Sequence, residues 1–100
     1  MDYQVVLSPS ARADLRDIVR YISFDAPDRA LQFGLFLTSR TRLLAQSPEL
    51  GRIVPEFEDP FIREIVVRSY RVVYRVDNSR RLVEVIRFWH AARGTPEINA

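Results

Sequence analysis

The alternation of apolar and polar residues predicts a strand and then a helix at the start of the chain. Over residues 3–7, apolar side chains recur at every second position, which is the pattern of a half-buried strand. Ser8 and Pro9 follow as an N-cap residue and a first helical residue. Beyond them, apolar residues recur at the spacing of one helix face: Ala11, Leu15, Ile18, Val19 and Ile22.

The sequence Asp25-Ala26-Pro27 interrupts this pattern and starts a second helix, predicted from about Pro27 to Gln46. Because the link between the two helices is short, they should form a helical hairpin. The second helix carries more apolar surface than one stripe, since Leu31, Leu35 and Phe36 widen it. We expect this width to pack in the core, and the alternative is that it binds a partner protein.

The second half of the chain has the composition of a strand meander. The segment from Ile53 to Pro60 is predicted to be an acidic loop, and residues 77–80 are predicted to form a hairpin turn. Three runs rich in β-branched and aromatic residues are predicted as strands: residues 61–68, 70–76 and 82–91. Residues 94–100 have no periodicity, so we expect one domain over residues 1–93 and a flexible C-terminal tail over 94–100.

The predicted order is β-α-α-β-β-β, which indicates an α+β fold of two layers. The helical hairpin should cover one face of an antiparallel sheet. Alternation within residues 70–76 then places Arg71 and Arg75 on the opposite face, and Arg87 belongs with them. We expect these guanidinium groups to point outward from a partly open sheet face.

Composition narrows the possible chemistry. The chain of 100 residues is one domain's worth, and it has no cysteine, which excludes disulfides, thiolate zinc sites and cysteine nucleophiles. His90 stands alone, so a histidine-rich metal site is excluded, and neither a metal nor a cofactor is expected. No apolar run approaches the ~18 residues of a membrane span, and a cytoplasmic protein without membrane contact is expected.

Charge is unevenly distributed along the chain. All fifteen basic residues are arginine. Residues 1–62 carry seven Arg and nine acidic residues, a net charge of −2, whereas residues 63–93 carry eight Arg and three acidic residues, a net charge of +5. Arginine is suited to binding phosphate and carboxylate. The basic half therefore suggests a surface for an anionic partner, and the alternative is a solvated strand face.

The strongest candidate for chemistry lies on the last two predicted strands. A hairpin turn at residues 77–80 can bring Arg71 opposite the stretch 86–90, which contains Arg87, Trp89 and His90. An arginine can hold a scissile phosphate while a nearby histidine acts as general acid or base. The alternative is a packing histidine beside a structural network of arginine and acidic residues, with Trp89 in the core.

Several segments resemble the RelE/ParE superfamily of type II toxins. These are LSPSARADLRDIVRYI, DAPDRALQF, SPELGR and IREIVVRSYRVVYRVDNSRRLVEVIRFWHAARG. Together they span essentially residues 3–93, and YRVVYRV combined with a strand ending in RFWHAAR is the most specific part. The long helical hairpin is more similar to the ParE branch than to the RelE branch.

The resemblance implies a toxin that a cognate antitoxin neutralises, in a hetero-oligomer in which the antitoxin tail lies on the hairpin and sheet. It implies antitoxin contacts at Leu31, Leu35, Phe36 and Arg68. ParE-like members inhibit DNA gyrase, and the resemblance therefore favours gyrase as the target. A target or phosphate contact is expected at Arg52, Arg75, Arg87 and Trp89.

RelE-like members instead cut mRNA on the ribosome, which is the alternative enzyme reading. In that case Arg71 corresponds to the catalytic arginine, His90 or Trp89 to the group at the end of the last strand, and Arg52 or Glu56 to a further site residue. The lysines of several RelE-like nucleases have no counterpart, because the chain contains no lysine. A third possibility is a plasmid-stabilisation relic without toxicity.

Overall fold

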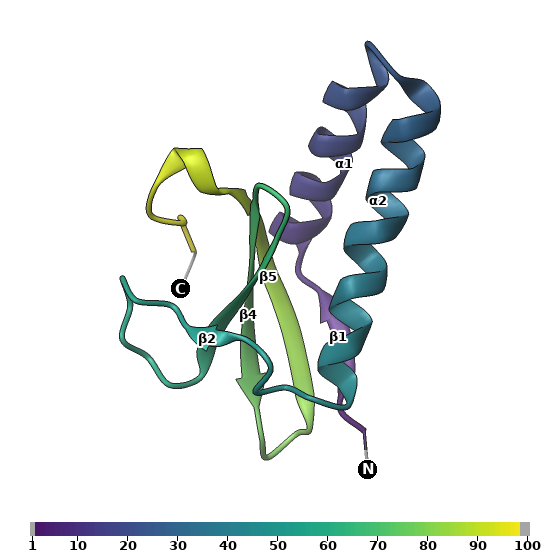
Figure 1. Cartoon of the computed structure of the whole chain (residues 1–100). Coiled ribbons are helices and arrows are strands. Elements are labelled where there is room, and N and C mark those ends of the chain that lie inside the picture. Colours follow the sequence, from purple (N-terminus) through teal and green to yellow (C-terminus); the bar gives the residue numbers. More distant parts are fainter. Residues whose placement is uncertain (1, 99–100) are drawn as a thin grey trace.

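Five strands form one mixed sheet in the order β1-β5-β4-β3-β2, with two helices on one face (Figure 1). The computed structural model describes residues 2–98. Strand β1 runs parallel to β5, and the other neighbours are antiparallel. The elements are β1 (Gln4–Leu7), α1 (Pro9–Ser23), α2 (Pro27–Arg42), β2 (Arg52–Ile53), β3 (Ile62–Val67), β4 (Tyr70–Asp77) and β5 (Leu82–His90), with short 3-10 turns at Leu43–Ala45 and Ala91–Arg93. The predicted α+β fold is confirmed, and β2 is an additional strand that periodicity did not indicate.

Ser8 joins the sheet to the first helix, as its predicted N-cap role requires. Its Oγ accepts from the Ala11 N–H at 3.1 Å and donates to the Ile86 carbonyl, also at 3.1 Å. Its own N–H donates to the Val85 carbonyl at 2.8 Å. Ser8 therefore continues the pairing of β1 with β5 while satisfying a free N–H of α1. This double role fixes where α1 begins.

The second helix ends earlier than the sequence indicated. α2 stops at Arg42, and the next residues tighten into the 3-10 turn Leu43–Ala45. Such a tightened last turn satisfies helix-terminal carbonyls. The hairpin prediction itself is confirmed, and Gly34 marks the close approach of the two helices: a Cβ there would lie 2.8 Å from Cγ2 of Val19.

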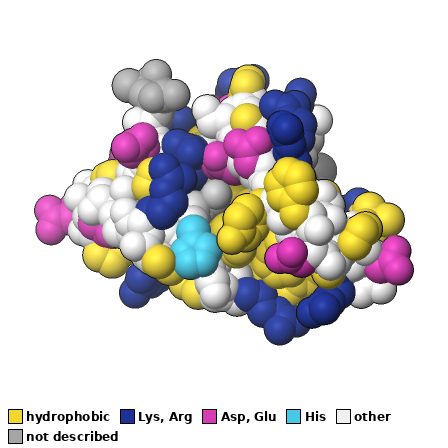
Figure 2. Space-filling view, turned by 90° about the horizontal axis from the view of Figure 1, so that it is seen from above, with side chains coloured by type: hydrophobic (Ala, Val, Ile, Leu, Met, Phe, Trp, Pro, Cys, Tyr) yellow, Lys and Arg dark blue, Asp and Glu magenta, His cyan; other side chains and the backbone are white. Residues whose placement is uncertain are grey.

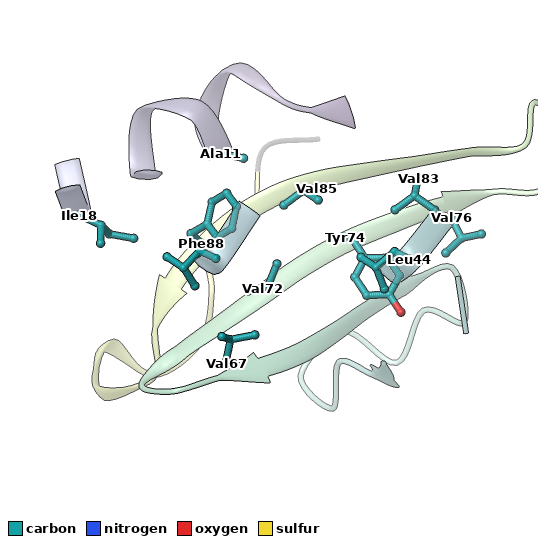
Figure 3. Packing of buried hydrophobic residues seen from close by; sticks show 11 residues of the cluster. Ala11, Ile18, Leu44, Val67, Val72, Tyr74, Val76, Val83, Val85 and Phe88 are labelled. Atoms are coloured by element: carbon teal, nitrogen blue, oxygen red, sulfur yellow. The ribbon is translucent and has the colours of Figure 1, made fainter. Parts of the chain in front are cut away.

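The main core lies between the helices and the sheet (Figure 3). Side chains of Ala11 and Ile18 from α1 face Val72, Val85 and Phe88 from the strands. A second, smaller cluster lies on the opposite face of the sheet and contains Val54, Ile62, Val73 and Ile86, with Phe57 and Ile98 packed against it. The sheet is thus covered on both faces, by helices on one and by loop and C-terminal residues on the other.

The C-terminal residues that the sequence suggested as a flexible tail fold back over the sheet face opposite the helices (Figure 1). The Gly94 carbonyl accepts from Arg71 Nη1 at 3.0 Å and from Trp89 Nε1 at 3.1 Å. The Glu97 carbonyl accepts from Arg87 Nη1 at 2.7 Å. These side-chain donors and the packing of Ile98 hold residues 94–98 on the domain, whereas residues 99 and 100 lie outside the described part.

Within residues 2–98, no helix is both long enough and apolar enough to span a membrane.

Candidate functional site

Arg71 lies on the sheet face away from the helices, as predicted, but it does not point into solvent. It pairs with Trp89 of β5 across the sheet, which confirms that the hairpin brings residue 71 opposite the stretch 86–90. However, Arg71 is 8% exposed. The expectation of an outward guanidinium is therefore wrong for this residue. The physical reason is that carboxylates and the C-terminal residues cover it.

Every N–H of the Arg71 guanidinium has a partner. Nε donates to Glu64 Oε1 at 2.6 Å, and Nη2 donates to Glu64 Oε2 at 3.2 Å. Glu56 accepts two further bonds, from Nη1 at 2.8 Å and Nη2 at 2.7 Å. The Gly94 carbonyl takes the remaining donor at 3.0 Å. Because a guanidinium has five N–H donors, none remains for a phosphate.

Arg52 completes this group, which we call the Arg71 cluster (Arg52, Glu56, Glu64 and Arg71). Arg52 stands opposite Glu64 in the β2–β3 pairing and donates to Glu64 Oε2 at 2.8 Å. The Glu64 side chain is fully buried, whereas that of Arg52 is 62% exposed. The cluster thus holds two positive and two negative groups, so its charges cancel. Arg52, predicted as a target contact, is already paired.

The cluster shifts the ionisation of its members. Hydrogen bonds from Arg71 lower the pKa of Glu56 from 4.5 to about 2, against the opposing effect of burial. The hydrogen bonds that Arg71 donates, first to Glu56 and then to Glu64, raise the pKa of Arg71 above its ordinary value. Each partner therefore keeps the other charged at neutral pH.

This shift gives a pH-dependent prediction. Because the folded-state pKa of Glu56 is below its ordinary value, the stabilisation is fully present above pH 4.5 and is lost as pH falls toward about 2. We expect Glu56→Gln to flatten the fall of the free energy of unfolding in this acid range, measured by urea denaturation. Glu58→Gln on the same loop is the control. Equal acid profiles for the two variants would contradict the assignment.

His90 lies on the other face of the sheet. It pairs with Tyr70, and the two rings meet edge to face with centroids 5.1 Å apart. Its Nδ1 accepts from the Ala92 N–H at 3.1 Å, so His90 caps the final 3-10 turn. Successive residues of a strand point to opposite faces. The predicted catalytic pair of Arg71 and His90 is therefore not assembled in this structure.

An open groove of about 490 Å³ surrounds His90 on the helix side of the sheet. Asp17 and Tyr21 of α1 form one wall, and Tyr70, His90 and Arg93 contribute to the other. Burial raises the pKa of Tyr70, and Tyr21 adds to this effect. Figure 2 shows the histidine beside a patch of hydrophobic side chains, with arginine and acidic residues around it.

The remaining predicted contact residues on the strands are also engaged. Arg87 makes two hydrogen bonds to Asp14, at 2.7 and 2.9 Å, and its guanidinium lies 4.8 Å from the centre of the Trp89 ring. Arg93 lies over the same ring at 3.8 Å, and Trp89 is 2% exposed, so the indole is not free to stack on a base. Arg75 is 3.7 Å from Glu84 in an exposed pair.

The four residues predicted to contact an antitoxin separate into two surfaces. Phe36 and Arg68 meet in a cation–π contact of 5.0 Å and line a hollow of about 400 Å³ together with Ile22, Arg29, Gln32 and Phe33. Leu31 and Leu35 do not line this hollow, and they are 63% and 62% exposed. At 100° per residue, they lie on a different side of α2 from Phe36.

Sequence reasoning missed Glu64, which is central to the Arg71 cluster. A signal was present, since Glu64 alternates with the apolar residues Ile62 and Val66 on one face of a predicted strand. A lone acidic residue at such a position indicates a buried ion pair. Among residues 2–98, no three His, Asp or Glu side chains come together as a metal site.

Comparison with known proteins decides the family. Residues 5–94 match the family described as the ParE toxin of the type II toxin-antitoxin system, parDE. The chain belongs to this family. It is 37% identical over 91 residues to Toxin RelE2 of Caulobacter vibrioides, a match that covers 90% of this chain and 97% of that protein. The predicted resemblance to the RelE/ParE superfamily is thereby confirmed.

Solved structures share the fold of this ParE-family chain. The chromosomal ParDE system of P. aeruginosa gives a TM-score of 0.74 at 20% identity, covering 88% of this chain and 95% of that one. The RelBE2 toxin-antitoxin complex of Mycobacterium tuberculosis gives 0.67 at 20% identity, covering 90% and 99%. A free-state mutant of E. coli toxin RelE gives 0.66 at 21% identity, covering 94% and 88%.

Proposed function

We propose that this chain is a toxin that arrests growth by binding DNA gyrase, without breaking a bond through its own residues. The observation that carries this proposal is the state of the Arg71 cluster. Arg71 has no free donor, and His90 is on the opposite face of the sheet. General acid–base catalysis needs its groups within hydrogen-bond reach of one reacting phosphate. A protein that acts by binding needs no such pair.

Ribosome-dependent cleavage of mRNA is the second candidate, favoured by the 37% identity to Toxin RelE2. For this reaction Arg71 would have to exchange Glu56 or the Gly94 carbonyl for a substrate phosphate. Because the pKa of Glu56 is about 2, Glu56 stays ionised at neutral pH. Protonation of Glu56 therefore does not release Arg71. A relic without toxicity is the third candidate, and it predicts no growth arrest.

We also propose that a cognate antitoxin neutralises the toxin in the cytoplasm by covering the hollow that contains Phe36 and Arg68. The hollow is mainly apolar, and Arg29 and Arg68 are among the residues that line it. An amphipathic helix with acidic flanks fits such a hollow. The structural relatives of this chain come from systems named ParDE and RelBE2, which supports a partner of this kind.

His90→Asn separates the two active candidates. Asparagine keeps a side-chain acceptor for the Ala92 N–H but has no ionisation near neutral pH. We expect growth arrest after expression to be unchanged, with gyrase–DNA cleavage complexes accumulating and mRNA remaining intact. The measurement pairs viable counts with recovery of trapped gyrase and with transcript mapping on the ribosome.

Loss of arrest in a folded His90→Asn protein, together with cleaved mRNA in the wild type, would assign the nuclease activity instead. The wild-type protein co-expressed with its antitoxin provides the baseline. If the wild-type protein does not arrest growth, the relic without toxicity is the remaining candidate.

A further inference from the structure

The outer side of α1 carries a row of arginines that no function described above uses. Arg12, Arg16 and Arg20 follow each other at four-residue spacing, so they form a ridge along one side of the helix with steps of about 6 Å. All three are exposed, and within residues 2–98 none is in an ion pair. We call these three residues the arginine ridge.

The acidic residues of α1 do not neutralise the ridge. Asp14 turns toward the sheet, where it binds Arg87 and accepts from the Phe88 N–H at 3.0 Å. Asp17 lines the groove near His90. Asp25 and Asp28, at the tip of the hairpin, form no ion pair with the ridge either. A helix side that presents basic groups alone is complementary in charge to an acidic partner.

An apolar hollow lies directly beside the ridge. It measures about 530 Å³ and is lined by Leu15 and Val19 between the three arginines, with Ser23 at one end. Val19 touches α2 at Gly34, and the exposed Leu31 and Leu35 flank this contact in sequence. The side of the hairpin away from the sheet is uncovered (Figure 1). A basic ridge thus borders an apolar hollow, and the helix that Val19 contacts exposes two leucines close in sequence to that contact.

These features select among possible occupants. A second copy of this chain in a two-fold symmetric dimer would place one arginine ridge against another, which repels. A nucleic-acid backbone would pair with the arginines but would leave Leu31 and Leu35 in water. An amphipathic helix with acidic residues along one side pairs with the ridge and buries the leucines together.

We propose that the arginine ridge, with Leu31 and Leu35, is the surface that binds gyrase through an acidic amphipathic helix of that enzyme. This inference rests on the proposed function. It assigns the target to a different side of the hairpin from the hollow of Phe36 and Arg68. The toxin then presents one face to its target and another to its antitoxin.

The test compares two charge-matched variants of the full chain. Arg16→Glu/Arg20→Glu reverses two ridge residues, and Arg80→Glu/Arg81→Glu reverses two exposed arginines in the β4–β5 turn. Inhibition of purified gyrase supercoiling is measured at two salt concentrations, and antitoxin affinity is measured by calorimetry. We expect the ridge variant to inhibit at least about tenfold less, with a weaker salt dependence and unchanged antitoxin affinity. The turn variant should match the wild type.

Leu31→Gln/Leu35→Gln gives a second, charge-independent arm and should also weaken inhibition. A ridge variant as potent as the wild type overturns the inference while the gyrase function stands. The inference is also overturned if the ridge variant loses antitoxin affinity to the same extent, or if it loses binding to duplex DNA in the absence of gyrase. In either case the ridge would bind another partner. A wild-type protein that does not inhibit gyrase overturns the proposed function itself and the inference with it.

Discussion

Arg71→Leu should lower the free energy of unfolding by about 3–5 kcal/mol, because it leaves the buried Glu64 carboxylate without its main partner. The Glu64 side chain is fully buried, and Arg52, its other partner, is 62% exposed. Leucine also removes the hydrogen bonds to Glu56 and to the Gly94 carbonyl. This loss loosens both the loop that carries Glu56 and the C-terminal residues. Urea denaturation of the purified protein measures the change.

The control for this variant is Arg75→Leu, since Arg75 is in an exposed pair with Glu84. Removing an exposed pair should cost no more than about 1 kcal/mol. Arg71→Leu/Glu64→Leu should recover much of the stability, because apolar residues can replace a buried pair with little loss. If Arg71→Leu lowered the free energy of unfolding no more than Arg75→Leu does, the Arg71 cluster would not stabilise the fold. Loss of toxicity in an Arg71 variant therefore needs a stability measurement before it is read as chemistry.

Gly51→Ala should destabilise the domain by about 1–3 kcal/mol, because the new methyl group would clash with neighbouring atoms. A Cβ at Gly51 would lie 2.3 Å from the Glu64 carbonyl oxygen and 2.8 Å from the Tyr74 hydroxyl. Relief of the clash must move β2 away from β3. That movement strains the Gly51 N–H bond to the Tyr74 hydroxyl, which measures 2.9 Å, and displaces Arg52 from Glu64.

Gly34→Ala is the matched control for Gly51→Ala. Its Cβ would meet a side-chain methyl of Val19 at 2.8 Å rather than backbone, and alanine is the better helix former. In a domain of this size, each kcal/mol lost lowers the melting temperature by about 4–8 °C. We therefore expect in calorimetry a clear fall for Gly51→Ala and a smaller fall for Gly34→Ala, whose methyl group must displace Val19. Equal effects would contradict the backbone clash.

The order of elements could be predicted because each long element carries its own periodicity. The Ser8-Pro9 cap and the alternation from Tyr70 onward suffice to position α1 and β4. Strand β2 has two residues, which is too short for any period, and its pairing depends on contacts with β3. The C-terminal residues 94–98 are held by side chains of β4 and β5, which local sequence does not reveal.

The candidate site could not be predicted in full because one residue shifts the register of the β4–β5 hairpin. From the turn, Tyr74 pairs with Val85, but Val73 pairs with Arg87, so Ile86 is an inserted residue. An uninterrupted hairpin would place Arg71 opposite Phe88 and leave His90 on the same face as Arg71. With the bulge, Arg71 meets Trp89, and His90 turns to the helix side. Nothing in the run of strand-forming residues marks the position of that insertion.

Folding pairs charged residues from the two halves of the chain. In the arginine-rich C-terminal half, Arg71 pairs with Glu56 and Arg87 pairs with Asp14. Both acidic residues belong to the N-terminal half. That N-terminal half in turn exposes Arg12, Arg16 and Arg20. These three arginines are therefore open to a polyanion that approaches the helical layer, and their substitution should weaken retention on a cation-exchange column.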